Sequence, residues 1–280
     1  AFEMLARAKA LEAQGRKIVH LEIGEPDFDT PVNIRDAAKK ALDDGYTHYG
    51  PAAGLPEARK AIAESVSKTR GVPMKPEEVI IVPGGKPVIF FAVLALVDPG
   101  DEVLYPNPGF PIYESMIHYV GGKAVPLPIL EQNGWDFDPA EFERLLTSKT
   151  KLVILNSPAN PTGGVMSKRT MERVARALAD KAPQAVLLSD EIYSRIIYDG
   201  THQSLLSLPG MKERTLLLDG FSKTWAMTGW RLGYGAGPKW LIDAMAKLAT
   251  NDHSCTASFA QLAAIGGHDR LLAEALQQGG

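Results

Sequence analysis

Short apolar segments alternate with helix-like segments along most of this 280-residue chain. The helix-like segments lie at 87–97, 111–120, 139–146 and 168–181. The strand-like segments read, in chain order, EVIIV, EVLYP, KAVPLP, KLVILN, AVLLSD, TLLLD and LGYGAG. Strands that alternate with helices at this spacing pair mostly in parallel, and helices cover both faces of their sheet. The sequence therefore predicts an α/β fold built on a mostly parallel sheet.

Further elements are expected on either side of this alternating region. Apolar residues recur at helical spacing in 2–14 and 33–43, and KIVHLEIG between them (17–24) is strand-like. A Gly/Pro-rich loop at 47–59 leads into a helix that runs to about Arg70. A long helix is expected to begin at 239, and one or two more should follow in 256–280.

Composition excludes several classes of partner. A net charge of -3 and a pI near 6.1 give no reason to expect nucleic acid or a membrane surface. Cys255 is the single cysteine, so an internal disulfide and a cysteine-built metal site are excluded and a reducing cytoplasm is the default. The most apolar run, Val88–Val97, is too short to span a bilayer. The chain also lacks the phosphate-loop, dinucleotide, serine-hydrolase and zinc-protease motifs, and no metal is expected.

A lysine and an arginine follow the strand-like segment TLLLD, in GFSKTWAMTGWRLG (220–233). The carboxyl ends of strands are where open α/β sheets bind ligands. Lys223 lies there among small and apolar neighbours, which favour a depressed pKa and a nucleophilic amine. Arg231 can grip a phosphate in fork geometry. Taken alone, such residues are more often solvated charges. Together, an amine for an aldehyde and a guanidinium for a phosphate suit pyridoxal 5'-phosphate (PLP).

This stretch closely resembles the PLP-lysine signature of the class I/II aminotransferases, the aspartate aminotransferase-like enzymes of fold type I. In that signature small, apolar and small residues precede the lysine, and Gly-x-Arg-apolar-Gly ends the motif. The resemblance extends from about Lys17 to Lys247, with the motifs in the family's order. It implies a mostly parallel seven-stranded sheet between helices, PLP as cofactor, and a homodimer with shared sites.

The resemblance also implies a division into domains. Residues 1–20 would be an N-terminal segment associated with the small domain, and 21–245 the large PLP-binding domain. Residues 246–280 would begin a C-terminal small domain that is apparently truncated. Family members carry there an arginine that forks onto the substrate's α-carboxylate, and Arg270 in GGHDRLLAEA does not resemble that motif.

Three residues would bind the cofactor ring if the resemblance holds. Asp190, which ends the strand AVLLSD and begins DEIY, corresponds to the partner of the ring nitrogen, and Tyr193 to a donor to the 3'-oxygen. Asn160, in NPTG, corresponds to the asparagine that bonds the 3'-oxygen near the substrate carboxylate. Read without the resemblance, Asp190 is a helix or turn cap and NPTG is a turn.

The phosphate would bind at VPGGKP (82–87), where Gly84, Gly85 and Lys86 match the family's phosphate loop. Lys86 is also a candidate for reaching the distal carboxylate of an acidic substrate. Relatives often place a hydroxyl three residues before the lysine, where this chain has Gly220, and Ser222 is a candidate to compensate.

Three further residues take roles from the resemblance. Phe110 corresponds to the aromatic residue that stacks on the cofactor ring, although large aromatic residues usually belong to a core. Tyr49 corresponds to a tyrosine that reaches across the dimer to the neighbour's phosphate, and Gly24 to a glycine that lines the substrate carboxylate site.

The implied activity is transamination. Lys223 would form a Schiff base with the cofactor, and an amino group would move from an L-amino acid to a 2-oxo acid, with aspartate and glutamate as candidate donors. Two alternatives remain: a PLP-dependent carbon–sulfur lyase of the same fold, and a truncated, non-catalytic PLP-binding protein. The sequence does not tell how a chain of this length holds the α-carboxylate.

Overall fold

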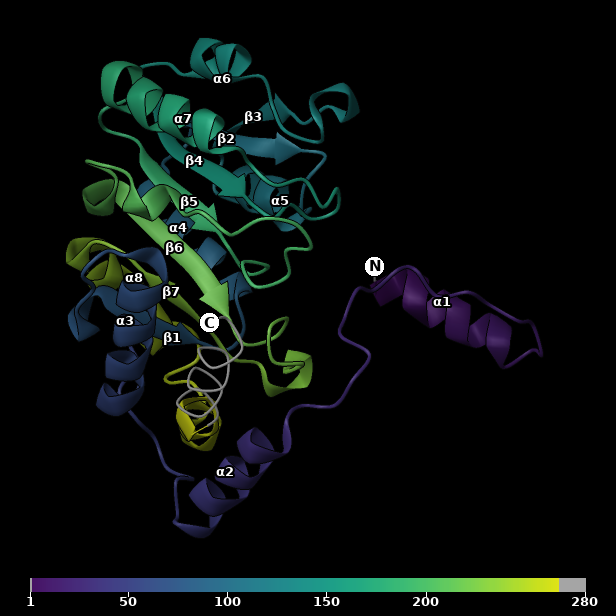
Figure 1. Cartoon of the computed structure of the whole chain (residues 1–280). Helices are drawn as coiled ribbons and strands as arrows, with labels where there is room; N and C mark the ends of the chain where they lie inside the picture. The colour runs from purple at the N-terminus through teal and green to yellow at the C-terminus, as the bar shows by residue number, and fades with distance from the viewer. Residues whose placement is uncertain (1, 267–280) are drawn as a thin grey trace.

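A seven-stranded sheet forms the centre of the computed structural model, which describes residues 2–266 (Figure 1). The strand order is β1-β7-β6-β5-β4-β2-β3. β7 runs antiparallel to both of its neighbours, and the other pairs are parallel. The expected fold class, with a mostly parallel seven-stranded sheet, is confirmed. The strands are β1 (Val79–Val82), β2 (Glu102–Asn107), β3 (Lys123–Pro128), β4 (Thr150–Asn156), β5 (Val186–Asp190), β6 (Thr215–Gly220) and β7 (Gly233–Ala236).

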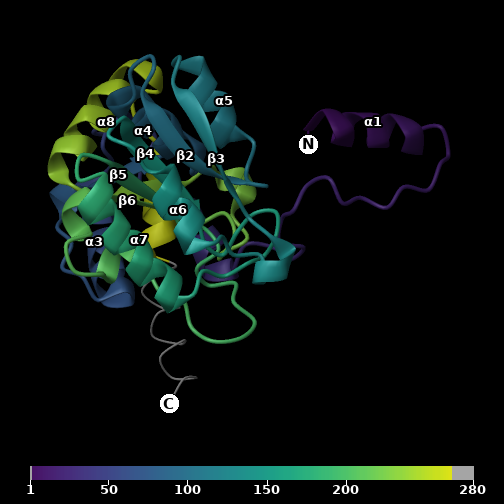
Figure 2. The ribbon, with the colours of Figure 1, turned by 90° about the horizontal axis from the view of Figure 1, so that it is seen from above.

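Helices cover both faces of this sheet (Figure 2). α4 (Lys86–Leu96), α5 (Ile112–Tyr119) and α8 (Lys239–Asp252) pack on one face, and α3 (Pro56–Arg70), α6 (Pro139–Leu145) and α7 (Lys168–Lys181) pack on the other. Successive side chains of a strand point to opposite faces. Leu187 and Leu188 of β5 accordingly enter different cores, and each is 0% exposed. Burial on both faces explains why the strands read as continuous apolar runs.

The parallel strands bring their carboxyl ends to one edge of the sheet. At that edge Asn156, the last residue of β4, pairs with Asp190, the last residue of β5. The backbone amide of Glu191 then donates to the carbonyl of Leu218 on β6 at 2.8 Å, which holds β5 and β6 together beyond their last strand pair. The chemistry-bearing residues of the sequence are gathered at this edge.

Short 3-10 helices and the remaining α-helices complete the described chain. α2 (Val32–Asp43) follows the N-terminal region, and residues 258–266 are helical. The remainder of the expected 256–280 helices, and Arg270, lie outside the described residues. The 3-10 helices are η1 (Pro76–Glu78), η2 (Glu131–Asn133), η3 (Leu205–Ser207), η4 (Lys212–Arg214) and η5 (Thr228–Trp230). Among residues 2–266, no helix is both long enough and apolar enough to cross a membrane.

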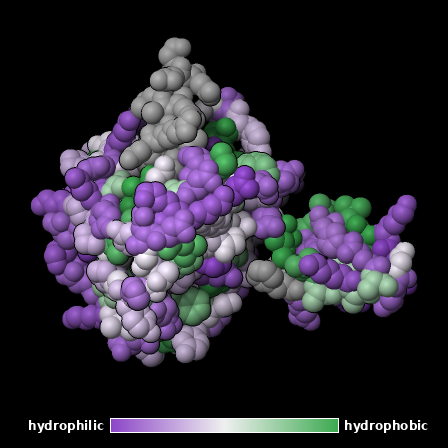
Figure 3. All heavy atoms as spheres, turned by 90° about the horizontal axis from the view of Figure 1, so that it is seen from below, coloured by the Kyte–Doolittle hydropathy of each residue, from purple (hydrophilic) through white to green (hydrophobic). Residues whose placement is uncertain are grey.

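The N-terminal arm lies away from the sheet and its helices (Figures 1 and 2). It begins with α1 (Phe2–Glu12), on which hydrophobic residues are visible at the surface (Figure 3). The strand expected at 17–24 is wrong, because these residues form no strand. A strand needs a partner for its backbone hydrogen bonds, and this segment pairs with no strand of the sheet; Val19 is 84% and Leu21 88% exposed.

Candidate active site

Lys223 lies three residues beyond the end of β6, in the loop that leads to η5. Its amine donates a hydrogen bond to the carbonyl oxygen of Gly24, which brings a residue of the N-terminal region to the edge of the sheet. Burial lowers the pKa of Lys223, and the nearby negative charge of Glu25 opposes this effect. A lowered pKa leaves more of the amine unprotonated, which a nucleophile requires.

Asp190 is the buried acid of the site. Its Oδ2 accepts a 2.6 Å hydrogen bond from the Tyr113 hydroxyl, and its Oδ1 accepts a 3.2 Å bond from the backbone amide of Ile192. Burial raises the pKa of Asp190 to about 6, although both hydrogen bonds act in the opposite direction. The sequence did not identify Tyr113. Its one local signal is a position at the start of α5, three residues after Phe110.

Asn160 and Tyr193 lie together beside Asp190. The side chain of Asn160 hydrogen-bonds the Tyr193 hydroxyl, while burial, and after it the charge of Asp190, raises the pKa of Tyr193. Asn156 links the backbones of Asn160 and Asp190. Its Oδ1 accepts a hydrogen bond from the Asn160 backbone amide at 2.7 Å, and its Nδ2 donates to the Asp190 backbone carbonyl at 2.9 Å. The three residues predicted to bind a cofactor ring are therefore brought together.

Gly84, Gly85 and Arg231 form a cradle for an anion at the N-terminus of α4. Gly85 is the N-cap of α4, where backbone amide groups and the helix dipole favour negative charge. Gly84 has a φ of +87°, and a Cβ added there would lie 2.2 Å from Nη2 of Arg231. Arg231 is itself held by a 2.7 Å bond from Nη1 to the Thr228 carbonyl. Only glycine lets this guanidinium approach the turn so closely.

Phe110 contacts both Lys86 and the tyrosine that bonds Asp190. The ring of Phe110 meets the ring of Tyr113 edge to face, with centroids 5.9 Å apart. Nζ of Lys86, the first residue of α4, is 5.7 Å from the centroid of Phe110. Phe110 therefore lies against the residue that holds Asp190, as a support for a bound ring would.

Two residues predicted to bind the cofactor, Ser222 and Tyr49, have no described side-chain contact with the other site residues. Ser222 lies beside Lys223, and its carbonyl accepts a 3.1 Å bond from the Met227 amide, which shapes the lysine loop. Tyr49 is 90% exposed and is not part of the group of contacts described above.

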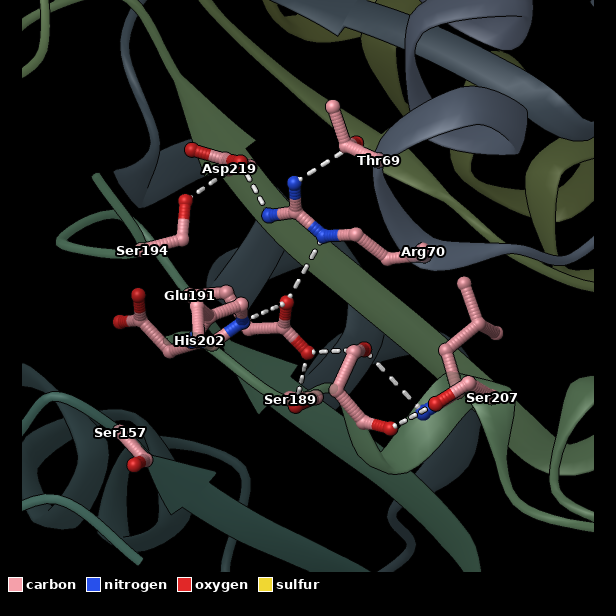
Figure 4. Close-up of polar contacts among 12 residues, drawn as sticks. Thr69, Arg70, Ser157, Ser189, Glu191, Ser194, His202, Ser207 and Asp219 are labelled. Carbon is pink, nitrogen blue, oxygen red and sulfur yellow. Dashed lines mark hydrogen bonds and ion pairs between the residues drawn. The ribbon is translucent and has the colours of Figure 1, made fainter. Parts of the chain in front are cut away.

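A buried ionic cluster, which the sequence did not predict, lies behind the site (Figure 4). Arg70, at the C-terminal end of α3, donates to Glu191 and Asp219 at 3.1 and 2.7 Å. The sequence features that could have indicated this cluster were weak: Glu191 follows Asp190 in DEIY, and Asp219 ends the apolar segment TLLLD. Among residues 2–266, no group of three or more His, Cys, Asp and Glu side chains is arranged to hold a metal ion.

The residues at this edge fit PLP by their chemistry. Lys223 offers an amine to the aldehyde, and Asp190 offers a carboxylate to the ring nitrogen. The space that a Cβ at Gly84 would fill, together with Arg231 and the start of α4, suits the phosphate. Asn160 and Tyr193 provide the hydrogen-bonding groups that the 3'-oxygen requires.

Comparisons with known proteins agree with this fit. The chain matches the family described as "Aminotransferase class I and II" over residues 16–278. It is 44% identical to the aspartate aminotransferase of Pyrococcus abyssi, over 90% of this chain and 65% of the relative. The aspartate/prephenate aminotransferase of Thermus thermophilus is 41% identical, over 93% of this chain and 66% of the relative. The chain thus spans just under two thirds of the length of these relatives.

The fold agrees as well. The structure of Thermus thermophilus aspartate aminotransferase with maleate superposes with a TM-score of 0.93 at 39% identity, covering 98% of this chain and 71% of that one. The chain therefore belongs to the class I and II aminotransferases, PLP-dependent enzymes of fold type I.

Proposed function

We propose that this chain binds PLP through Lys223 and moves an amino group from an L-amino acid to a 2-oxo acid. The observation that carries the proposal is the meeting of Lys223, Asp190 and the Gly84–Arg231 cradle at one edge of the sheet. The relatives are named for aspartate and prephenate transamination. Because the chain spans just under two thirds of their length, its activity and substrates are part of the proposal.

The protein's residues divide the work as follows. The bound cofactor supplies an electron sink for the charge that develops on the substrate's Cα. Asp190, ionised in most molecules at neutral pH, keeps the ring nitrogen protonated by accepting its proton in a hydrogen bond. Lys223 attaches the cofactor by its amine. When free, the same amine would take the proton from the substrate's Cα as general base and deliver it to the cofactor carbon as general acid.

The remaining groups orient the cofactor and the substrate. The amides at the start of α4 and the Arg231 guanidinium hold the phosphate. Asn160 and Tyr193 hydrogen-bond the 3'-oxygen, Phe110 supports one face of the ring, and Ser222 adds a hydroxyl beside the phosphate. Each of these contacts limits the bound geometry, which lowers the entropy cost of reaching the reactive arrangement.

An acidic amino acid is the proposed donor. Lys86 lies close to Phe110 and would meet a distal carboxylate, while the Gly24 backbone and Asn160 would line the site of the α-carboxylate. This assignment accords with the printed names of the relatives.

Assembly and location also belong to the proposal. The exposed Tyr49 supports a homodimer in which this side chain reaches the partner's phosphate. Residues 1–20 would associate with a small domain that begins near 246, within α8, and 21–245 would form the large domain. The single cysteine agrees with a cytoplasmic location.

The absorbance spectrum of the purified chain tests this function. With PLP added, a visible band is expected that requires Lys223 and is absent from Lys223→Ala. Addition of aspartate or glutamate should bleach the band and release one equivalent of 2-oxo acid. Release of pyruvate and ammonia from a sulfur-containing amino acid would instead identify a lyase. No band with added PLP would refute the proposal, and a band that no amino acid changes would leave only cofactor binding.

A further inference from the structure

One arginine bridges the two strand ends that lead to Asp190 and Lys223. Arg70 is 8% exposed, and its Nε donates to Oε2 of Glu191 while its Nη2 donates to Oδ2 of Asp219 (Figure 4). Glu191 directly follows Asp190, and Asp219 lies on β6 four residues before Lys223. A single guanidinium therefore contacts the neighbours of both proposed catalytic groups.

The arginine acts on the face of the sheet opposite the acid. Asp190 turns toward Tyr113 on α5, whereas Glu191 turns toward Arg70 on α3. Because Glu191 directly follows Asp190, a contact that fixes the Glu191 side chain also limits movement of the Asp190 backbone. The contacts of Arg70 with Glu191 and Asp219 can therefore affect the geometry of the site without touching the cofactor.

Each oxygen of the two carboxylates has a hydrogen-bond donor. Carboxylates whose oxygens are all paired in a low-dielectric interior are held rigidly. Besides Arg70, Glu191 accepts from Ser189, His202 and Ser204 at 2.9, 2.7 and 2.5 Å, and Asp219 accepts from the Gly220 amide and Ser194 at 2.7 and 3.4 Å.

Resting on the proposed function, we propose that Arg70 is a positioning residue: its fork onto Glu191 and Asp219 holds the ends of β5 and β6 so that the Asp190 carboxylate meets the ring nitrogen of PLP. The fork requires a rigid planar donor, because one acceptor directly follows β5 and the other lies on β6. Lysine would keep the charge but not the two fixed donor directions.

The charges at this place explain why a cation is needed. Glu191 and Asp219 are two buried carboxylates close to one another and to Asp190, and like charges in an interior repel. Burial raises the pKa of Asp219, and Arg70 opposes this shift. For Glu191, burial acts against the charged form, yet the bonds from His202 and the charge of Arg70 hold its pKa below the ordinary value. Arg70 thus favours the ionised form of both acceptors of its fork.

The test compares two ligands on the cofactor-free 280-residue chain. One is PLP, and the other is its analogue with carbon in place of the ring nitrogen. Fluorescence of Trp225, two residues from Lys223, reports the dissociation constants. A charged hydrogen bond to the nitrogen should make PLP bind about tenfold or more tightly than the analogue. Asp190→Asn defines how much of this preference the acid supplies.

The expected result is that Arg70→Lys lowers the preference for PLP by at least about threefold, with a smaller loss in Glu191→Gln. Glu191→Gln keeps its size and an acceptor for Arg70, so it serves if the arginine variant fails to fold. Arg173→Lys is the matched control, because Arg173 donates from Nε and Nη2 to Oε1 of Glu143 at 2.9 and 2.6 Å, remote from the site. It should leave the preference unchanged.

The outcomes separate this inference from the proposed function. If the folded Arg70 or Glu191 variants weaken PLP and the analogue equally, or weaken neither, Arg70 serves the fold alone and the inference is refuted. In that case the proposed cofactor role still stands, provided that the wild-type chain binds PLP more tightly than the analogue. If the wild-type chain fails to bind PLP or shows no preference, the proposed function fails and this inference fails with it.

Discussion

The hydroxyl of Tyr113, on α5, donates a 2.6 Å hydrogen bond to Oδ2 of Asp190 at the end of β5. Tyr113 is 0% exposed and is held in turn by the edge-to-face contact with Phe110. The acid is therefore oriented from inside the core, and the proposed support for the cofactor ring, Phe110, lies two residues before the helix that orients it. This arrangement couples the packing of α5 to the charge state of the site.

Removing that hydroxyl should make Asp190 easier to protonate. The bond from Tyr113 favours the ionised carboxylate, so Tyr113→Phe should raise the pKa of Asp190 above its value of about 6 and weaken PLP binding by about tenfold at neutral pH. The pKa can be followed by carbon NMR of selectively labelled aspartate carboxyls, with Asp190→Asn identifying the signal.

Tyr105→Phe provides the control for this variant. The Tyr105 hydroxyl donates to Glu114 at 2.9 Å, so the substitution removes a comparable hydroxyl–carboxylate bond that does not involve Asp190. An Asp190 titration that moves equally in both variants, or in neither, would show that Tyr113 does not set the ionisation of the acid.

Asp190 should also make the cofactor-free chain less stable as the pH rises. Its pKa in the fold, about 6, lies above the ordinary 3.8, so the folded chain retains a proton that the unfolded chain releases. The favourable contribution is complete below pH 4 and is lost as the pH rises through 6, at most about 3 kcal/mol. PLP binding should strengthen over the same interval, because it needs the ionised acid.

Urea unfolding of the wild type and Asp190→Asn measures this dependence. Between pH 4 and pH 7 the wild type should lose stability relative to the variant, since other titrating groups act on both proteins alike. A difference in unfolding free energy that stays constant with pH would contradict the raised pKa.

Gly84→Ala should impair phosphate binding through Arg231. The new Cβ would occupy the place of the Arg231 guanidinium, and a φ of +87° would cost about 1–2 kcal/mol of stability. Affinity for PLP should fall by about tenfold or more, while affinity for pyridoxal, which lacks the phosphate, should change little. Fluorescence titration with both compounds gives the comparison.

Gly100→Ala isolates the backbone strain in that experiment. Gly100 has a φ of +90°, and a Cβ there would meet nothing within 4 Å. This variant should lose similar stability and keep the preference for PLP over pyridoxal. An equal loss of that preference in both variants would exclude the specific role of the Gly84–Arg231 contact.

Local patterns predicted the elements that depend on local chemistry. The helix expected at 168–181 is α7, whose N-cap Ser167 accepts a hydrogen bond from the amide of Thr170. The run TLLLD became β6 because apolar residues on both faces require burial on both sides. The strand-like segment at 17–24 failed because its pattern supplies no pairing partner. The antiparallel direction of β7 likewise depends on its neighbours, β1 and β6.

The site was predictable where its residues lie in short motifs. Asp190, Tyr193, Asn160 and Lys223 each follow a strand in a distinctive segment, and the sheet brings those segments together. Arg70 could not be found in this way, because its partners Glu191 and Asp219 lie 121 and 149 positions along the chain. Contacts of that separation depend on how α3 packs on the sheet, which no local spacing encodes.

Lys86 should select acidic substrates if the proposed geometry is correct. Lys86→Ala removes the cation near Phe110, so kcat/KM for aspartate should fall by about tenfold or more, whereas an uncharged amino acid such as phenylalanine should be affected little. The ratio of the two values measures selectivity independently of the amount of active protein. Equal losses for both substrates would place Lys86 with the phosphate rather than the substrate. An unchanged ratio with full activity would remove Lys86 from the site altogether.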